Sequence, residues 1–300
     1  MTPTSPRTPS TSPDPTAPRG REVVGISTIT FRHRPLEEAL RLIEGIGAVE
    51  IDLGAIPDVT DHVPVPFHGD VAAYLELLER HHLRAGAVNA DIGNINDPAY
   101  DREALQERTE PLLDLAVATG GALIVNCGRQ DRADYVDERS DMAAVAGNLE
   151  YLGRLSADHG VRLLVEVLHH RRWIHSVDRA NRLLELVDPS VFGLLFDTAH
   201  VGASEEDVVG WAEQVHDRIE RVHFRDALPG NLNVGIGRGT VDFAAVIDTL
   251  ERHGFGGSYV LELETHDVAE EDREADAKRS FDLIAEMVAA RPAPQEMSGR

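Results

Sequence analysis

Short apolar runs alternate with amphipathic stretches over residues 22–290. Within several of the runs the apolar residues are nearly continuous, which is typical of strands buried on both faces of a parallel sheet. In the stretches between them, apolar residues recur every three or four positions, as on one face of a helix. The pattern predicts strands over 22–28, 48–54, 83–90, 122–128, 161–168, 192–199, 219–226 and 257–265.

The segments between and after these strands predict helices over 35–46, 70–82, 102–120, 141–160, 176–187, 204–219, 242–254 and about 270–289. Residues that start helices stand at Ser176, Ser204 and Asp242, and glycines that end them at Gly120, Gly160 and Gly254. Eight strand–helix units in about 270 residues predict an α/β fold, a single closed (β/α)8 TIM barrel. The alternative is a doubly wound open sheet, but the first strand continues as ISTITFRHR, without a glycine-rich dinucleotide loop.

We expect one domain. Residues 1–21 are rich in Pro, Ser and Thr and are predicted to be a disordered tail, followed by the barrel over 22–290 and a flexible tail over 291–300. There is no apolar run of roughly 18 residues, so no membrane span is expected. The single cysteine, Cys127, allows no intrachain disulfide and indicates a reducing, cytoplasmic setting.

The charge of the chain bears on its partners. The 300 residues include 29 basic and 52 acidic side chains, which gives a formal net charge of −23. Proteins that bind nucleic acid neutralise phosphates with patches of Lys and Arg, so no nucleic-acid partner is expected.

Metal-competent side chains lie at the ends of the last four predicted strands: Glu166, Asp197, His223 and Glu262. Their separations of 31, 26 and 39 residues each correspond to one strand–helix unit. Because neighbouring parallel strands lie about 4.8 Å apart, the four side chains can converge on one divalent ion. Three carboxylates and one imidazole suit Mn²⁺ or Mg²⁺, with Co²⁺ or Zn²⁺ also possible.

The alternative is that each of the four is an independent structural residue, such as a carboxylate in a salt bridge. Glu264 competes with Glu262, because alternate residues of a strand share a face. Glu262 is the expected ligand, since it directly follows the apolar run YVL. Glu50, on the second strand, is expected to form a structural ion pair inside the barrel.

The segments FDTAH, VHFRD, VGIGRGTVDF and YVLELE, with GISTITF and GIGAVEIDLG earlier in the chain, occur in a specific order. In this order the chain resembles the xylose isomerase-like TIM-barrel superfamily of sugar phosphate isomerases and epimerases, inosose dehydratases and AP endonucleases of family 2. The resemblance implies that Glu166, Asp197, His223 and Glu262 bind one divalent ion, with Glu166 and Glu262 as the acid/base pair. It also implies that His200 contacts substrate or a second metal, and that Arg238 lies in a loop approaching the substrate.

The sequence departs from two branches of this superfamily. In ketose 3-epimerases a second glutamate lies six residues beyond the strand-five ligand, whereas this chain has Arg172. That arginine could grip a carboxylate or phosphate, or could be a solvated loop residue. Of the adjacent histidines, one, such as His169, is expected to face the site, and Trp173 could wall the pocket or pack in the core. Endonuclease IV needs histidines on earlier strands, and the endings NADIGN and VNCGR have none.

The sequence therefore predicts a metal-dependent isomerase or epimerase that acts on a keto- or aldo-polyol by proton transfer through a metal-stabilised enediolate. The alternative is a lyase that dehydrates a cyclic keto-polyol of the inosose or dehydroshikimate type on the same barrel. A third reading is a non-catalytic sugar-binding barrel. The expected partner is a small polyhydroxylated molecule, and relatives suggest a homodimer or homotetramer.

Overall fold

The computed structural model describes residues 20–95, 101–127 and 137–291, and its strands close into one parallel barrel. The ring is closed by β1 (Val24–Ser27), which pairs with β2 (Glu50–Ala55) on one side and β10 (Ser258–Leu261) on the other. The remaining barrel strands are β3 (Arg84–Ala90), β4 (Ala122–Asn126), β5 (Leu163–Glu166), β6 (Gly193–Asp197) and β7 (Ile219–Phe224). The predicted (β/α)8 TIM barrel is confirmed.

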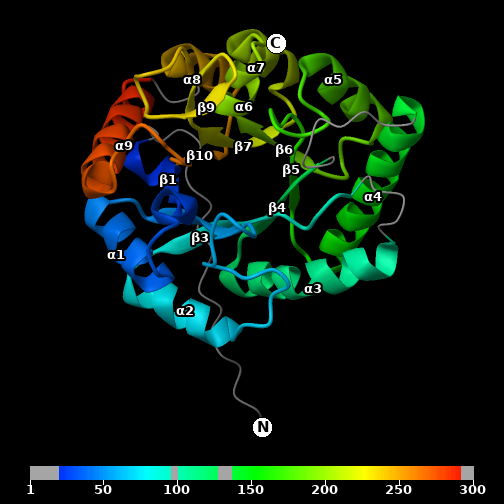
Figure 1. The fold of residues 1–300 in the computed structure, drawn as a ribbon, viewed down its shortest axis with the longest axis horizontal. Coiled ribbons are helices and arrows are strands. Elements are labelled where there is room, and N and C mark those ends of the chain that lie inside the picture. Colours follow the sequence, from blue (N-terminus) through cyan, green and yellow to red (C-terminus); the bar gives the residue numbers. More distant parts are fainter. Residues whose placement is uncertain (1–19, 96–100, 128–136, 292–300) are drawn as a thin grey trace, which may run out of the picture.

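Helices surround the barrel on its outer side (Figure 1). They are α1 (Leu36–Ile46), α2 (Val71–Arg80), α3 (Arg102–Thr119), α4 (Glu138–Asp158), α5 (Val177–Leu186), α6 (Thr198–Ala203), α7 (Val208–Val215), α8 (Phe243–Arg252) and α9 (Arg273–Ala289). Gly120, Gly160 and Gly254 follow helix ends with φ of 75°, 72° and 75°, as predicted from their positions. Glycine adopts this left-handed conformation without steric cost, which is why it ends helices.

The predicted helix 204–219 is shorter than expected, and an unpredicted helix, α6, precedes it. The segment 204–219 begins after α6, and Ser204 is the C-cap of α6 instead of the N-cap of the next helix, so that prediction is wrong. Glu205 has a φ of 63°, which breaks the helical backbone. Asp207 then starts α7, where its side chain accepts a hydrogen bond from the backbone N–H of Gly210 at 2.9 Å.

A short antiparallel hairpin follows β7 and was not predicted. It consists of β8 (Asp226–Leu228) and β9 (Asn231–Val234), and it packs against α6 on the carboxyl side of the barrel. Strands of three and four residues carry too little alternation to be recognised in a sequence.

The predicted tails at 1–21 and 291–300 lie outside the described residues, apart from Gly20, Arg21 and Arg291. In the part of the chain that the structure describes, no helix combines the length and the apolar character needed to cross a membrane.

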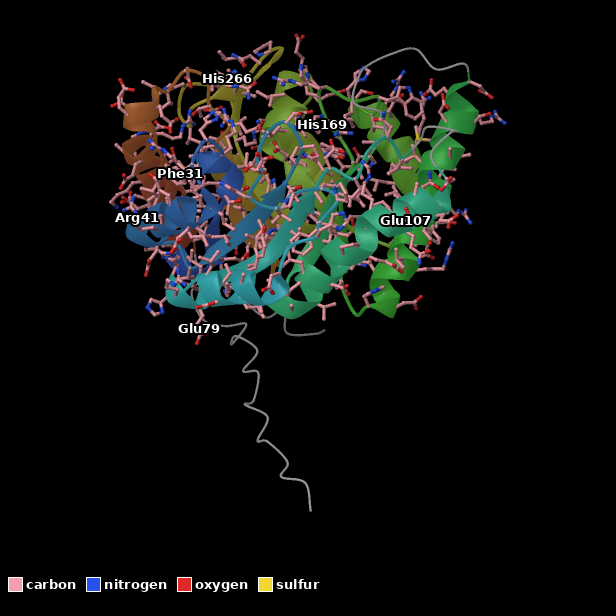
Figure 2. The ribbon with its side chains drawn as sticks, turned by 60° about the horizontal axis from the view of Figure 1, so that its bottom comes forward. Phe31, Arg41, Glu79, Glu107, His169 and His266 are labelled. Atoms are coloured by element: carbon pink, nitrogen blue, oxygen red, sulfur yellow. The ribbon has the colours of Figure 1, made fainter. Side chains whose placement is uncertain are left out.

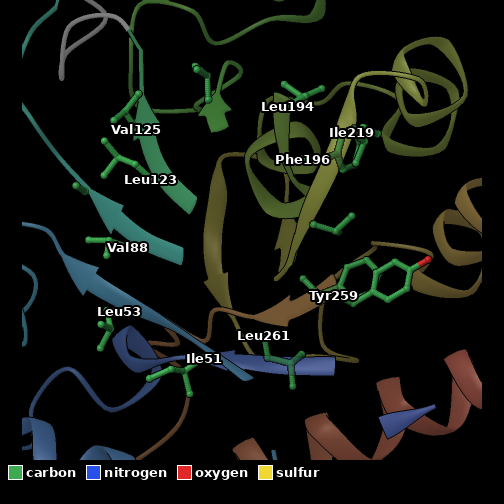
Figure 3. Close-up of a cluster of buried hydrophobic side chains, with 14 of the residues drawn as sticks. Ile51, Leu53, Val88, Leu123, Val125, Leu194, Phe196, Ile219, Tyr259 and Leu261 are labelled. Atoms are coloured by element: carbon green, nitrogen blue, oxygen red, sulfur yellow. The ribbon is translucent and has the colours of Figure 1, made fainter. Parts of the chain in front are cut away.

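Alternation along the strands divides the buried side chains into an outer and an inner set. Outward residues such as Ile51, Leu53 and Val125 pack between the barrel and the helices (Figure 3). On β3 to β6 the inward neighbours form a small apolar layer inside the barrel, made of Ala87, Ile124, Leu164 and Leu195. The outer set attaches the helices, and the inner set fills one half of the barrel.

The other half of the barrel interior is charged. Arg221 of β7 donates hydrogen bonds to Glu50 Oε1 at 2.7 Å and to the two oxygens of Asp52 at 2.9 and 2.6 Å. All three side chains are buried. The ion pair expected for Glu50 inside the barrel is confirmed, and Arg84 provides a second cation at 2.5 Å.

Gly86 makes room for this ion pair. A Cβ atom at this position would lie 2.5 Å from Arg221 Nη2 and 2.6 Å from Glu50 Oε1. Because both groups are held inside the barrel, we expect Gly86→Ala to lower the free energy of unfolding by about 1–3 kcal/mol, measured by urea denaturation. The matched control is Gly147→Ala within α4, where nothing lies within 4 Å and a gain of up to about 1 kcal/mol is expected. If both substitutions changed the free energy of unfolding equally, the close packing around Gly86 would be contradicted.

Candidate metal centre

The four predicted ligands meet at the carboxyl ends of the strands. Glu166 ends β5 and Asp197 ends β6, His223 lies in β7 opposite Asp197 in register, and Glu262 directly follows β10. Each is an inward position of its strand, and each side chain is buried. Four ionisable groups therefore lie together at one end of the barrel interior. Enzymes with this fold have their active sites at the same end.

The geometry of these groups fits a cation. One ligand atom each from Glu166, Asp197 and His223 lies within 4.8 Å of the other two, and Glu262 Oε1 lies 3.5 Å from His223 Nδ1. Asp197 Oδ2 and His223 Nδ1 are buried and have no hydrogen-bond partner among the described residues. Buried polar atoms are normally paired, so these two are the atoms that a metal ion would satisfy.

Asp197 is oriented by the helix that follows it. Its Oδ1 accepts hydrogen bonds from the backbone N–H groups of Ala199 at 2.8 Å and His200 at 3.1 Å, which makes it the N-cap of α6. One carboxylate oxygen is thus used to start the helix. The other oxygen, Oδ2, is left for the site.

His223 is oriented by the charged half of the barrel. Its Nε2 lies 2.9 Å from Asp52 Oδ2, and Asp52 is held in turn by Arg221. Burial alone would lower the pKa of His223, but the carboxylates of Glu262 and Asp52 outweigh it and raise the pKa to about 10. The contact with Asp52 directs Nδ1 toward the other ligands, in the carboxylate–histidine arrangement common behind metal-binding imidazoles.

Two imidazoles stand beside Glu166. The ring centroids of His169 and His200 are 3.8 Å apart. The backbone N–H of His170 donates to His200 Nδ1 at 3.1 Å, and that of Arg171 to His169 Nδ1 at 3.2 Å. Each Nδ1 is therefore an acceptor, which places the proton of a neutral ring on Nε2. The Nε2 atom of His169 lies 3.9 Å from the carboxylate of Glu166, and that of His200 lies 3.6 Å from it.

The charge states of this group differ from those of the free amino acids. Burial raises the pKa of Glu166 well above the ordinary carboxyl value, and the charges of Asp197 and Glu262 add to the rise. Burial lowers the pKa values of His169 and His200 well below the usual imidazole value. Both rings are therefore neutral N–H donors at neutral pH.

Glu262 is surrounded by donors. Its carboxylate accepts hydrogen bonds from Asn89 Nδ2 at 3.0 Å, Arg225 Nη1 at 3.2 Å and Ser27 Oγ at 3.5 Å. Burial would raise the pKa of Glu262, but the neighbouring His223 and Arg225 lower it below its ordinary value. Glu262 is held as a carboxylate.

Arg225 separates the two glutamates that competed in the sequence. Its Nη2 donates to Glu264 Oε2 at 2.7 Å, while its Nη1 contacts Glu262 and lies 3.7 Å from Asp197 Oδ2. The structure places Glu262 against His223 and Glu264 beyond Arg225.

Three predicted substrate-binding residues have other surroundings. Arg172 is buried and donates to Asp91 Oδ2 at 2.7 Å, so it is not a solvated loop residue. Trp173 is packed in the core, the second of its two expected roles. The half-exposed Arg238 pairs with Asp267 and Asp276 at 3.1 and 3.0 Å. Within the described residues, none of these ion pairs includes one of the four candidate ligands.

Three residues at the site were not predicted: Asp52, Asn89 and Arg225. The alternation of β2 places Asp52 on the same inward face as Glu50, two residues earlier, and Arg225 follows His223 by two residues. The spacing in the sequence could have predicted that the side chains of Asp52 and Arg225 point into the barrel. It could not have identified their partners on other strands.

Comparison with known proteins gives a consistent family. The family model described as "Xylose isomerase-like TIM barrel" matches residues 36–287. The inosose dehydratase of Salmonella agona (strain SL483) is 24% identical over 214 residues, which cover 65% of this chain and 64% of that protein. The inosose dehydratase of Bacillus licheniformis is 31% identical over 137 residues, covering 39% of this chain and 44% of that protein. The chain thus spans less than two thirds of the length of these relatives.

Solved structures share the fold. The IOLI protein with a binding zinc atom matches with a TM-score of 0.71 at 17% identity, covering 88% of this chain and 98% of that chain. L-ribulose 3-epimerase matches with a TM-score of 0.70 at 18% identity, covering 88% and 94%. At these identities the likeness concerns the fold alone.

The contact between Asp52 and His223 gives the first prediction for the site. We expect Asp52→Asn to weaken the binding of a divalent ion about 10- to 100-fold, because the imidazole loses its anionic partner. Titration calorimetry with Mn²⁺ and Zn²⁺ measures this. The matched control is Glu50→Gln, which also alters the surroundings of Arg221 but does not contact His223, and which should affect stability more than metal affinity. Similar metal affinities for Asp52→Asn and the wild type would contradict the role of Asp52.

The second prediction concerns Arg172. Arg172→Met removes a buried cation from Asp91, and we expect the free energy of unfolding to fall by about 3 kcal/mol in chemical denaturation. Arg182→Met, at an exposed ion pair of α5, should change it by less than about 1 kcal/mol. If Arg172→Met had the same free energy of unfolding as the wild type, the ion pair between Arg172 and Asp91 would not stabilise the fold.

Proposed function

The chain belongs to the xylose isomerase-like TIM-barrel family, as its motifs indicated, and within this family we propose that it is a metal-dependent lyase. Its substrate is a polyhydroxylated ketone, from which it removes one molecule of water. The observation that carries the proposal is the position of Glu166, a buried carboxylate of raised pKa faced by the Nε2–H groups of two neutral imidazoles.

Glu166, Asp197, His223 and Glu262 would hold one divalent ion, which supplies the Lewis acidity that makes a C–H bond beside a ketone more acidic. Asp197 Oδ2 and His223 Nδ1, two buried atoms without a hydrogen-bond partner among the described residues, support this assignment. Three carboxylates and one imidazole accommodate Mn²⁺, Mg²⁺, Co²⁺ or Zn²⁺.

The protein residues then account for the movement of the proton. Glu166 takes the proton from the carbon next to the ketone, and the electron pair of that C–H bond forms a carbon–carbon double bond as the hydroxyl group on the next carbon leaves. Glu166 gives the same proton to the departing hydroxide, so water is released and the carboxylate is restored. His169 and His200 donate hydrogen bonds from Nε2 to substrate oxygens on which negative charge develops.

Two further observations support dehydration. The curated relatives described above are named inosose dehydratases. In addition, Arg172 occupies the position of the second glutamate of ketose 3-epimerases, and it is paired with Asp91. The carboxylate expected to hold sugar oxygens in an epimerase is therefore replaced by a buried ion pair.

The isomerase or epimerase expected from the sequence is the second candidate. Epimerisation needs one group that gives a proton and another that takes one. The pKa of Glu166 is raised and that of Glu262 is lowered, which suits such a pair. The donors around Glu262 hold it as a carboxylate, and this favours the single-carboxylate elimination.

The proposal is tested with an inosose and protein loaded with each of the four metals. We expect a product lighter by one water in mass spectrometry, with new ultraviolet absorbance from a conjugated carbonyl. EDTA should abolish the reaction. In D₂O, substrate that gains deuterium and inverts a carbon centre without losing water would overturn the lyase in favour of the epimerase.

Glu166→Gln supplies the variant for this assay. It should lower kcat by about 10²- to 10⁴-fold, because the amide cannot take up the proton. Circular dichroism checks that the variant is folded. The matched control is Glu107→Gln, at an exposed position of α3 on the outer side of the barrel (Figure 1), which should leave kcat unchanged.

A further inference from the structure

A cavity of about 450 Å³ opens at the carboxyl side of the barrel, beside the candidate metal centre. Its walls come from the segments after β1, β2, β5 and β10 and from β9, and its charged side chains are Arg32, Asp58, Arg171, Glu264 and Arg273. His266 lines the cavity, and His169 lies two residues before Arg171 in the chain. Figure 2 shows both histidines toward one end of the barrel and Glu79 at the other. The cavity therefore shares its face with the site.

Side-chain contacts connect the walls of the cavity to the metal centre. Glu264 lines the cavity and accepts from Arg225, whose other nitrogen donates to Glu262. On the opposite wall, Arg171 lines the cavity, and its backbone N–H holds the imidazole of His169. These contacts place the cavity next to the groups of the metal centre.

Two guanidinium groups of the cavity have no carboxylate partner among the described residues. Arg32 forms no ion pair or side-chain hydrogen bond there, and its Nη1 is buried without a partner. Arg171 is exposed, and the hydrogen bond it makes through its side chain goes to the amide oxygen of Asn233 at 2.7 Å. By contrast, the third arginine, Arg273, is paired with Glu270 at 2.8 Å.

This arrangement is unusual for a chain whose formal net charge is −23. The buried arginines at this face, Arg172 and Arg225, are paired with carboxylates. Among the described residues, the acids of the cavity form no ion pair with Arg32 or Arg171. Glu264 is already bound to Arg225, and Asp58 is exposed and forms no ion pair with either arginine in the described structure. Burial lowers the pKa of Arg32, and the nearby charge of Glu264 only partly offsets this effect.

We infer that Arg32 and Arg171 bind an anionic group, a carboxylate or a phosphate, carried by the substrate at the end remote from the reacting carbons. Guanidinium groups match both anions with paired N–H donors, and both are stronger partners than neutral hydroxyl groups. The inference rests on the proposed function, because it assigns the substrate class of the same site: a keto-polyol acid or a keto-polyol phosphate. The anion-binding role expected for Arg172 belongs instead to Arg171 and Arg32.

Binding is measured separately from turnover, so that the two proposals can fail independently. The probes are D-gluconate, D-glucitol 6-phosphate and neutral D-glucitol, titrated calorimetrically into the Mn²⁺-loaded full chain. We expect the better of the two anionic probes to bind about 10- to 100-fold more tightly than D-glucitol, and high salt to weaken its binding. The stronger of the two identifies the group as carboxylate or phosphate.

Arg32→Met and Arg171→Met should each weaken that anionic probe about tenfold or more and leave the affinity for D-glucitol unchanged. The matched control is Arg41→Met, at an exposed position on the outer side of the barrel in Figure 2, which should change neither. Urea denaturation verifies that the variants keep their stability.

Equal affinities for the charged and neutral probes, or variants that bind the anion as the wild type does, overturn the inference even if inosose is dehydrated. Tight binding of an anion that depends on both arginines supports it even if inosose is not a substrate. In that case, the keto acid or keto phosphate related to the better probe replaces inosose in the turnover assay.

Discussion

Arg221 lies inside the barrel between Glu50 and Asp52, and the burial of both carboxylates depends on its charge. An unpaired carboxylate in this position would cost several kcal/mol, whereas a fork of donors shared by two acids satisfies most of their lone pairs. Asp52 is thereby fixed as an acceptor, and it fixes the ring of His223 in turn. The orientation of a ligand at one end of the barrel is thus set by an ion pair deeper in its interior. Gly86 belongs to the same arrangement, since only a residue without a side chain leaves space for it.

The barrel interior is divided by chemistry. Beneath β3 to β6 it is filled by apolar side chains, and toward β2 and β7 it is filled by ion pairs. The ligands from β5 and β6 therefore lie above an apolar layer, where charges are poorly screened, while His223 lies above ion-paired side chains. This asymmetry contributes to a pKa that is higher for Glu166 than for Glu262. Two chemically identical side chains acquire different behaviour from the halves of the barrel that they stand on.

Much of the fold could be predicted, because alternating apolar runs and helical stretches report directly on burial. Eight strands, their order and the ends of several helices followed from that pattern, whereas the hairpin β8–β9 and the break at Glu205 did not, because they depend on a few local backbone angles. For the site, strand endings brought Glu166, Asp197, His223 and Glu262 to one place. The partners of Arg172 and Arg238 could not be foreseen, since an ion pair with Asp91 or Asp276 joins segments far apart in the sequence. Their positions in the family pattern suggested substrate binding, whereas the structure pairs both with carboxylates of this chain.

The two carboxylate oxygens of Asp197 have different roles. Oδ1 caps α6, and Oδ2 faces the candidate metal centre. This narrows the set of amino acids that the position can tolerate. Asparagine would keep a capping oxygen but bring no negative charge, and glutamate would keep the charge on a longer side chain that does not suit the cap. Serine or threonine could cap the helix without reaching the other ligands. A saturation library at position 197 would therefore retain a folded, metal-competent protein with aspartate alone, although helix α6 by itself would accept several residues.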